Sequence, residues 1–218
     1  MKPLSECRLY TFVDTAYLAS RPPELVTEQL CEGGSDLIQL RAKNMAVDEI
    51  RGIARRILPI VNRADVGLVI NDYPDVAASV GVSICHLGQE DFFGTGFTHR
   101  SACQSLGLGG GLRFGLSSHT RSQAQRPVAA GADYVAVGPV YKTGTKPSAK
   151  PVTLELVQWA TQNLSLPWFA IGGIDLENLE SVLKAGARRV CVVSAILNSR
   201  DIAAACRRFK DRLVSVGI

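Results

Sequence analysis

The sequence lacks the features of membrane proteins and of nucleic-acid-binding proteins. None of its apolar runs is long enough to cross a bilayer, and the opening M-K-P-L-S-E lacks the apolar core of a signal peptide. The net charge of +4 is mild and spread along the chain, without the basic block that is typical of proteins that bind nucleic acid. We therefore expect no membrane partner, no nucleic-acid partner and a cytoplasmic location.

Cysteine motifs are also missing, although the chain has six cysteines. They form no C-x-x-C pair and no metal-binding spacing. Cys85 and Cys191 lie inside apolar runs, which indicates buried, reduced thiols. This pattern agrees with the expected cytoplasmic location.

No linker or shift in composition divides the 218 residues, so we expect one domain, residues 1–218. Apolar runs with the length of buried strands recur along the chain, and helix-like stretches separate most of them. Eight strands that alternate with helices at this length predict an α/β fold, a single (β/α)₈ TIM barrel. The alternative is a doubly wound open sheet, whose glycine fingerprint is missing after the first run. The runs lie at about 8–13, 36–40, 68–70, 84–87, 112–116, 134–137, 168–171 and 190–193.

Three stretches between these runs carry more specific expectations. Asp175 is a suitable N-cap for a helix at 176–184. Pro127 lies inside a predicted helix at 118–130, which it would bend or shorten because it lacks an N–H donor. Residues 92–111 are rich in glycine and predict a long mobile loop, either a lid over a site or a surface insertion without a role.

Polar residues gather where the early predicted strands end. In a TIM barrel these ends meet on one face, which carries the active site. The sequence therefore predicts a site that combines amide, cationic and carboxylate groups. The residues are Gln39, Arg41 and Lys43 after one run, Asn71 and Asp72 after the next, and Asp91 after a third.

The later predicted strands end in segments suited to phosphate. The run at 134–137 breaks into a loop that holds Thr143, Thr145 and Lys146 around a glycine, and hydroxyls with an ammonium suit an anionic ligand. The last two runs continue into A-I-G-G-I and V-V-S-A, where exposed backbone N–H groups could approach a phosphate. An ordinary polar turn and glycines kept for packing are the alternatives.

An ordered set of motifs resembles the thiamine phosphate synthase family over nearly the whole chain. The motifs are Q-L-R-A-K (39–43), I-N-D (70–72), H-L-G-Q-E-D (86–91), G-L-S-S-H-T (115–120), G-P-V-Y-K-T-G-T-K-P (138–147), A-I-G-G-I (170–174) and V-S-A-I (193–196). The resemblance implies a TIM barrel that joins a pyrimidine diphosphate to a thiazole phosphate, or to its carboxylated form, and releases pyrophosphate with Mg²⁺. It also implies a dissociative reaction that requires no general base and no covalent nucleophile.

The resemblance further implies a role for each matching residue. The diphosphate and pyrimidine would contact the amides and cations of the early strands, and Mg²⁺ would bind two carboxylates. The thiazole phosphate would be held largely by backbone groups of the last two strands. The implied contacts of the pyrimidine diphosphate are Gln39, Arg41, Lys43 and Asn71, and the implied metal ligands are Asp72 and Asp91. Further implied contacts of the diphosphate and the substrates are Ser117, Thr143, Thr145 and Lys146. The implied contacts of the thiazole phosphate are Gly173, Val193 and Ser194. Of these, Arg41, Lys43, Ser117 and Lys146 are the implied catalytic residues.

Each of these residues also has a structural interpretation. Arg41 and Lys43 could be solvated charges, Asp72 a helix cap and Asp91 a loop carboxylate, while His86 and His119 suit structural roles better than catalytic ones. Two rival functions remain: a thiazole tautomerase of the same superfamily, with His119 as a proton shuttle, and a non-catalytic regulator that binds thiamine precursors. A homo-oligomer is compatible with all three functions.

Overall fold

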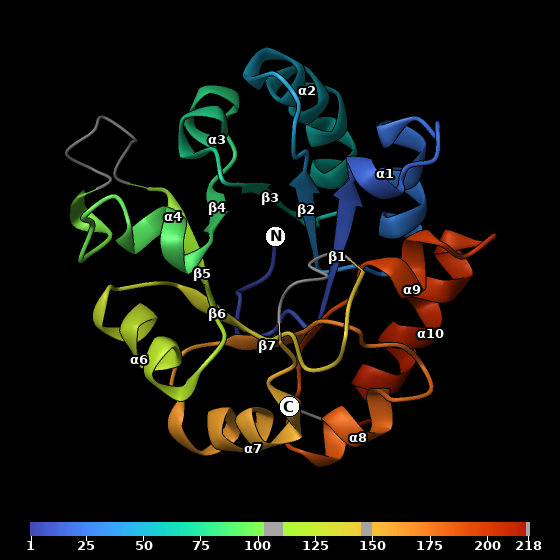
Figure 1. The fold of residues 1–218 in the computed structure, drawn as a ribbon. Coiled ribbons are helices and arrows are strands. Elements are labelled where there is room, and N and C mark those ends of the chain that lie inside the picture. The colour runs from blue at the N-terminus through green and yellow to red at the C-terminus, as the bar shows by residue number, and fades with distance from the viewer. Residues whose placement is uncertain (103–110, 145–149, 217–218) are drawn as a thin grey trace.

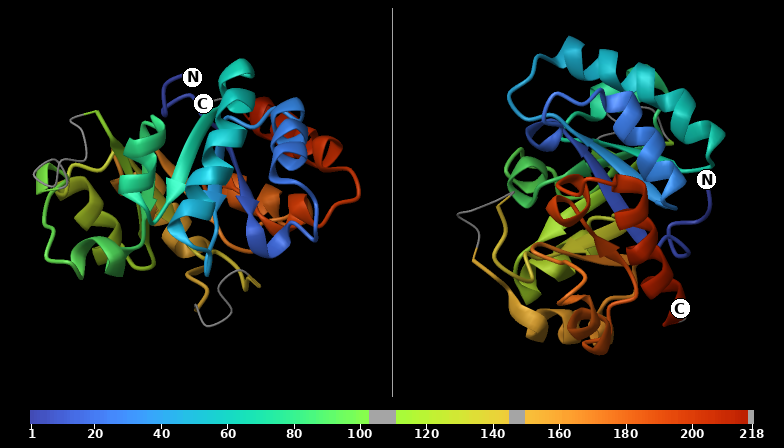
Figure 2. Two further views of the ribbon diagram at one scale, coloured as in Figure 1. Left: turned by 90° about the horizontal axis from the view of Figure 1, so that it is seen from above. Right: turned by 90° about the vertical axis from the view of Figure 1, so that its right-hand side faces the viewer.

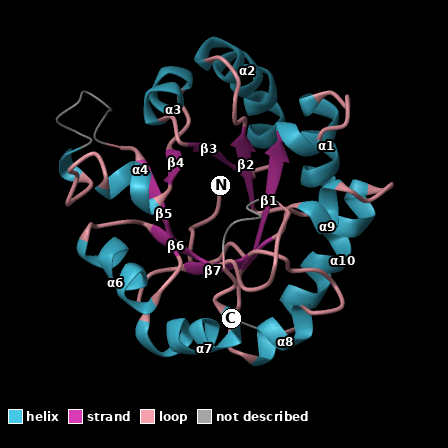
Figure 3. Cartoon of the chain, in the orientation of Figure 1, coloured by secondary structure: helices cyan, strands magenta, loops and turns pink. Residues whose placement is uncertain are grey.

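Eight parallel strands form a closed barrel in the computed structural model, which describes residues 1–102, 111–144 and 150–216. Each strand pairs with the next along the chain, and β8 pairs with β1 to close the ring (Figures 1 and 3). This arrangement confirms the predicted (β/α)₈ barrel. The strands are β1 (Leu9–Asp14), β2 (Leu37–Arg41), β3 (Gly67–Asn71), β4 (Ile84–Leu87), β5 (Arg113–Ser118), β6 (Tyr134–Val137), β7 (Trp168–Ile171) and β8 (Val190–Cys191).

Helices surround the barrel and follow the strands along the chain (Figure 1). Because they cover the outer face of the strands, both strand faces are buried, which explains the near-continuous apolar runs in the sequence. No helix in the described part of the chain combines the length and apolar character needed to span a bilayer. The helices are η1 (Thr15–Tyr17), α1 (Pro23–Glu32), α2 (Val47–Arg63), α3 (Pro74–Val80), α4 (Gln89–Phe93), α6 (Arg121–Ala129), α7 (Thr153–Asn163), α8 (Leu179–Lys184), α9 (Ser194–Leu197) and α10 (Ile202–Ser215).

The two ends of the barrel differ. Figure 2 shows both chain termini at one end, and the segment that follows β6 projects from the opposite end, where the strands have their carboxyl ends. Cys85 and Cys191 are buried thiols in the barrel wall, as predicted.

The helix after β7 begins later than predicted. The carboxylate of Asp175 accepts hydrogen bonds from the backbone N–H groups of Glu177 and Asn178, each at 2.9 Å. This interaction caps a turn rather than the helix, and α8 begins at Leu179. The prediction of a helix that starts at Leu176 is therefore wrong by three residues.

Pro127 remains inside its helix, in the last turn of α6. The helix starts at Arg121 because Thr120 caps it, its hydroxyl accepting from the N–H of Gln123 at 3.1 Å. Since proline donates no hydrogen bond, the carbonyl of Gln123 is left to another donor, and the side-chain amide of Gln89 reaches it at 3.2 Å. Pro127 thus frees a carbonyl that connects α6 to α4.

The prediction of a loop at 92–111 is wrong for its first part. Phe92 and Phe93 belong to α4, and the ring of the fully buried Phe92 lies 5.8 Å from that of Phe97. Further along, the guanidinium of Arg100 lies 3.0 Å from the carboxylate of Asp133. The described part of this segment is therefore packed onto the barrel, and residues 103–110 lie outside the described residues.

Asp36 organises the amino end of the barrel. Its carboxylate, almost fully buried, accepts hydrogen bonds from the N–H groups of Arg8 at 2.7 Å and Leu9 at 2.9 Å. The ammonium of Lys210 on α10 lies 2.5 and 2.6 Å from its two oxygens, and Lys2 is also paired with it. Burial alone would raise the pKa of Asp36, but the hydrogen bonds from Lys2, Lys210 and the backbone lower it below its usual value. One carboxylate therefore joins the N-terminal segment, β1 and the last helix.

We expect Asp36→Asn to lower the free energy of unfolding by about 3 kcal/mol at pH 7, because both ammonium groups lose a buried partner. Because the folded-state pKa of Asp36 is lowered, its contribution is present above the unfolded pKa of about 4 and is lost as pH falls through the folded pKa. Urea unfolding at several pH values measures the difference between the two proteins, which should shrink below about pH 4.

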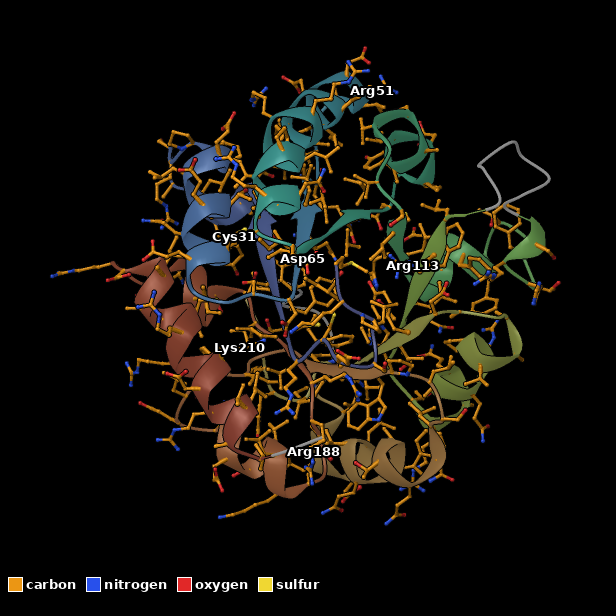
Figure 4. The ribbon with its side chains drawn as sticks, turned by 180° about the vertical axis from the view of Figure 1, so that it is seen from behind. Cys31, Arg51, Asp65, Arg113, Arg188 and Lys210 are labelled. Carbon is orange, nitrogen blue, oxygen red and sulfur yellow. The ribbon has the colours of Figure 1, made fainter. Side chains whose placement is uncertain are left out.

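Asp65→Asn is the matched control. Asp65 also pairs with an ammonium on this face, that of the N-terminus, but its side chain is 77% exposed (Figure 4). Its loss should cost less than about 1 kcal/mol. Equal costs for the two substitutions, or a cost at Asp36 that does not change with pH, would contradict this account.

Candidate active site

An open cavity lies at the carboxyl ends of the strands, with an empty volume of about 1000 Å³. All of the predicted site residues that the structure describes line it, and Thr145 and Lys146 lie outside the described residues. The predicted residues in its wall are Gln39, Arg41, Lys43, Asn71, Asp72, Asp91, Ser117, Thr143, Gly173, Val193 and Ser194.

Arg41 and Lys43 bring positive charge to one side of the cavity. Arg41 ends β2 beside Asp14, the last residue of β1, and its guanidinium lies 2.8 Å from the carboxylate of Asp14. The side chain of Asp14 is only 1% exposed, so this ion pair is shielded from water. Lys43 pairs with Asp72, but its side chain is 48% exposed. The cavity therefore has one rigidly held cation and one that can change partner.

Asp72 and Asp91 place two carboxylates in the same wall. Asp72 follows β3 with a left-handed backbone, φ 66°, and its N–H donates to the carbonyl of His86 at 2.9 Å. Aspartate adopts this conformation more readily than most non-glycine residues, because its short polar side chain can hydrogen-bond locally. Asp91 lies in the first turn of α4, where a Cβ at position 88 would approach its Oδ2 to 2.6 Å. Gly88 thus leaves room for the carboxylate.

The two carboxylates are a suitable but incomplete set of ligands for a hard cation. Within the described ranges, no three His, Cys, Asp or Glu side chains gather in a way that could hold a metal. Mg²⁺ takes one or two carboxylates together with water and phosphate oxygens, so Asp72 and Asp91 fit it when a phosphate-bearing ligand is also present.

The opposite side of the cavity is built from backbone. Gly172 and Gly173 follow β7 with φ of 102° and 64°, and a Cβ on Gly173 would lie 2.5 Å from the carbonyl oxygen of Lys142. A larger residue would therefore be strained and would displace the segment after β6. Val193 and Ser194 follow β8 at the start of α9, where the first N–H groups have no partner within the helix. Such groups suit a phosphate.

A chain of hydrogen bonds crosses the barrel at the bottom of the cavity. The amide of Gln39 donates to the hydroxyl of Tyr10 at 2.6 Å, which lies 3.0 Å from the hydroxyl of Tyr134. That hydroxyl lies 3.1 Å from Nδ1 of His86, whose Nε2 lies 3.0 Å from Oγ of Ser117. Two of the predicted residues, Gln39 and Ser117, are thus the ends of one network.

Sequence reasoning missed Asp14, Tyr10 and Tyr134, and it assigned His86 a structural role. All four side chains lie inside strands, where apolar runs predict packing only. The barrel register supplies the missing information, since it pairs Asp14 with Arg41 and places Tyr134 beside Gly115. His119 also lines the cavity, and its Nδ1 is hydrogen-bonded to the carbonyl of Gly138.

The two cations should differ in their effect on stability. Arg41→Met leaves the buried Asp14 carboxylate without its cation, so we expect the free energy of unfolding to fall by about 3–5 kcal/mol. Lys43→Met breaks a more exposed pair and should cost less than about 1 kcal/mol. Urea unfolding of both variants checks this difference, and a larger loss at Lys43 would show that the Asp14–Arg41 pair is not the structural one.

Comparison with known proteins agrees with the geometry. The sequence matches the model of the thiamine monophosphate synthase family over residues 9–196. It is 42% identical to a thiamine-phosphate synthase of Thermus thermophilus over 191 residues, covering 87% of this chain and 88% of that protein. It is 35% identical to that of Halalkalibacterium halodurans, covering 99% of both chains. The structure superposes on a thiamine phosphate pyrophosphorylase from Pyrococcus furiosus with a TM-score of 0.86, at 26% identity over 99% of both chains. The chain belongs to the thiamine monophosphate synthase family of enzymes.

Proposed function

We propose that this enzyme joins 4-amino-2-methyl-5-(diphosphooxymethyl)pyrimidine to 4-methyl-5-(2-phosphoethyl)thiazole, or to its carboxylated form, and releases pyrophosphate with the help of Mg²⁺. The observation that carries the proposal is one cavity with two different anion-binding sides. Cations and carboxylates from β2, β3 and β4 suit a diphosphate with a metal, and backbone groups after β7 and β8 suit a monophosphate.

In this proposal Arg41 and Lys43 stabilise the departing diphosphate. Negative charge grows on the leaving group as its bond to carbon breaks, so a cation held beside it lowers the barrier. The ion pair with Asp14 fixes the orientation of the Arg41 side chain before the substrate binds, so this side chain need not reorganise during the reaction. Lys146, implied in the same role by the family motif, lies outside the described residues.

Asp72 and Asp91 would hold Mg²⁺ together with the diphosphate. The ion would neutralise charge on the leaving group. Lys43 pairs with Asp72 but is half exposed, so its ammonium could also reach a diphosphate held beside that carboxylate. The carboxylates and the lysine would therefore serve the same ligand.

The floor of the cavity favours a dissociative reaction. Tyr10 and Phe12 line it with stacked rings 5.3 Å apart, and Ile171 adds an aliphatic wall. Such a surface offers no hydrogen bonds to water, which would otherwise compete with the thiazole nitrogen for a pyrimidine-stabilised cation. No group in this proposal acts as a general base or a covalent nucleophile.

The direct test incubates the purified protein with both precursors and Mg²⁺ and measures thiamine phosphate and pyrophosphate. We expect both products in equal amounts. A tautomerase would convert the thiazole substrate without using the pyrimidine diphosphate, and a regulator would bind precursors without turnover. Either result would replace the proposed function.

The metal assignment has a test that does not depend on turnover. We expect Mg²⁺ to bind weakly to the protein alone and to raise its affinity for pyrophosphate, because the protein supplies only part of the ligand set. Asp91→Asn should remove most of this Mg²⁺-dependent gain, as measured by calorimetric titration of pyrophosphate with and without the metal.

Glu90→Gln is the control, since Glu90 is an exposed carboxylate in the same helical turn and does not line the cavity. It should keep the full gain. An equal loss in both variants would indicate a general charge effect and would remove Asp91 from the metal site.

A further inference from the structure

We infer that the hydrogen bonds at the bottom of the cavity run in one direction, from Gln39 to Ser117, so that Ser117 faces its ligand as a hydrogen-bond donor. Tyr134, which is not among the residues that line the cavity, is then a positioning residue that acts through His86 and Ser117. The identity of the ligand beside Ser117 rests on the proposed function. The direction of the hydrogen bonds follows from the protein alone.

The direction begins at Gln39. Its Nε2 donates to the hydroxyl oxygen of Tyr10 at 2.6 Å, so this oxygen is already an acceptor. Tyr10 is 1% exposed, and the rings of Phe12, Phe169 and Tyr134 surround its own ring. A buried hydroxyl hydrogen needs an acceptor, and the oxygen of Tyr134 lies 3.0 Å away. Tyr10 therefore donates to Tyr134.

The next steps follow from the single hydrogen of each hydroxyl. Tyr134 accepts from Tyr10, so its own hydrogen is available to its other neighbour, Nδ1 of His86 at 3.1 Å. A neutral imidazole that accepts at Nδ1 carries its proton on Nε2. That N–H donates to Oγ of Ser117 at 3.0 Å, and the hydroxyl hydrogen of Ser117 then points to a further acceptor. Since Ser117 lines the cavity, a bound ligand can supply that acceptor.

The surroundings hold the two tyrosines in place. A Cβ on Gly115 would lie 1.9 Å from the ring of Tyr134, so only glycine at this register position admits the ring. Tyr134 also packs edge-on against Phe169, with ring centroids 5.6 Å apart. Burial raises the pKa of both Tyr10 and Tyr134 well above the usual value, so each hydroxyl keeps its hydrogen at neutral pH.

Because one lone pair of Ser117 Oγ is taken by His86 and its hydrogen is available, a hydrogen-bond acceptor is the favoured ligand atom beside it. In the proposed reaction the candidates are the oxygens of the diphosphate and the ring nitrogens of the pyrimidine, both of which accept. A donor at that place, such as the exocyclic amino group, would meet the Ser117 hydrogen and be disfavoured. The direction of these hydrogen bonds thus favours an acceptor edge of the substrate beside Ser117 on β5.

The tautomer of His86 tests the direction without any substrate. The sequence has three histidines, so long-range ¹H–¹⁵N spectra of ¹⁵N-histidine-labelled protein resolve each ring, with His86 assigned by its loss in His86→Asn. We expect the wild-type protein to show His86 protonated at Nε2. In Tyr134→Phe, Nδ1 loses its donor and this preference should weaken to a mixture of tautomers. A proton on Nδ1 in the wild type, or an unchanged tautomer in the variant, would overturn the inference.

A double-mutant cycle tests the effect on the reaction. Tyr134→Phe should lower kcat/KM about tenfold in the otherwise wild-type enzyme and should have no effect in a Ser117→Ala background, because it acts through Ser117. Equal losses in both backgrounds would mean that Tyr134 serves packing alone, which contradicts its positioning role.

Thr11→Val is the matched control for both measurements. Thr11 is a fully buried hydroxyl of β1 that bonds to Ser35 at 2.8 Å, outside the chain from Gln39 to Ser117. It should change neither the His86 tautomer nor kcat/KM. If the enzyme lacks synthase activity but His86 shows the expected tautomer, only the proposed function fails; if the enzyme is active and His86 carries its proton on Nδ1, only the direction fails.

Discussion

The closure of eight parallel strands into one ring is the constraint on which the site depends. Because all strands run the same way, all their carboxyl ends meet on one rim, and residues far apart in the chain line one cavity. Asp72 after β3 and Gly173 after β7 are far apart in the sequence, yet the barrel gives them opposite sides of the same space. In the proposed function, each of these sides would hold one anion.

Buried polar groups give this frame its precision. Asp14 holds Arg41 at the rim of the cavity. Asp36 joins the N-terminal segment and the last helix to the amino end of the barrel. The hydrogen bonds between Gln39 and Ser117, which pass through Tyr10 and Tyr134, fix the groups at the bottom of the cavity. Removing a partner from any of these buried groups would lower the stability of the folded protein, because water cannot reach the group to replace that partner. The same partners that stabilise the barrel therefore keep the functional side chains in one geometry.

The sequence predicts the part of this structure that depends on local pattern. Strands buried on both faces appear as apolar runs, and polar residues at their ends mark the rim, so the barrel and the cavity wall could be anticipated. Two local details were harder to predict. Asp175 caps a turn before α8 instead of the helix itself, and sequence pattern does not fix a helix start to within a few residues. Phe92 is part of a helix that packs its ring against another aromatic ring, a contact that the glycine-rich sequence does not reveal. The roles of Tyr10, Tyr134 and Asp14 could be recognised only from the strand register of the barrel. In the sequence alone, a tyrosine within an apolar run predicts a packing role.

The central claim is that one cavity binds a diphosphate and a monophosphate on opposite sides. A crystal structure of the protein with Mg²⁺, pyrophosphate and thiamine phosphate tests it most directly. The account predicts pyrophosphate beside Arg41 and Lys43, the metal between it and the carboxylates of Asp72 and Asp91, and the phosphate of thiamine phosphate on the backbone of Gly173 and Ser194. A structure with the phosphate ester at Arg41, or with both anions on the same side, would contradict it.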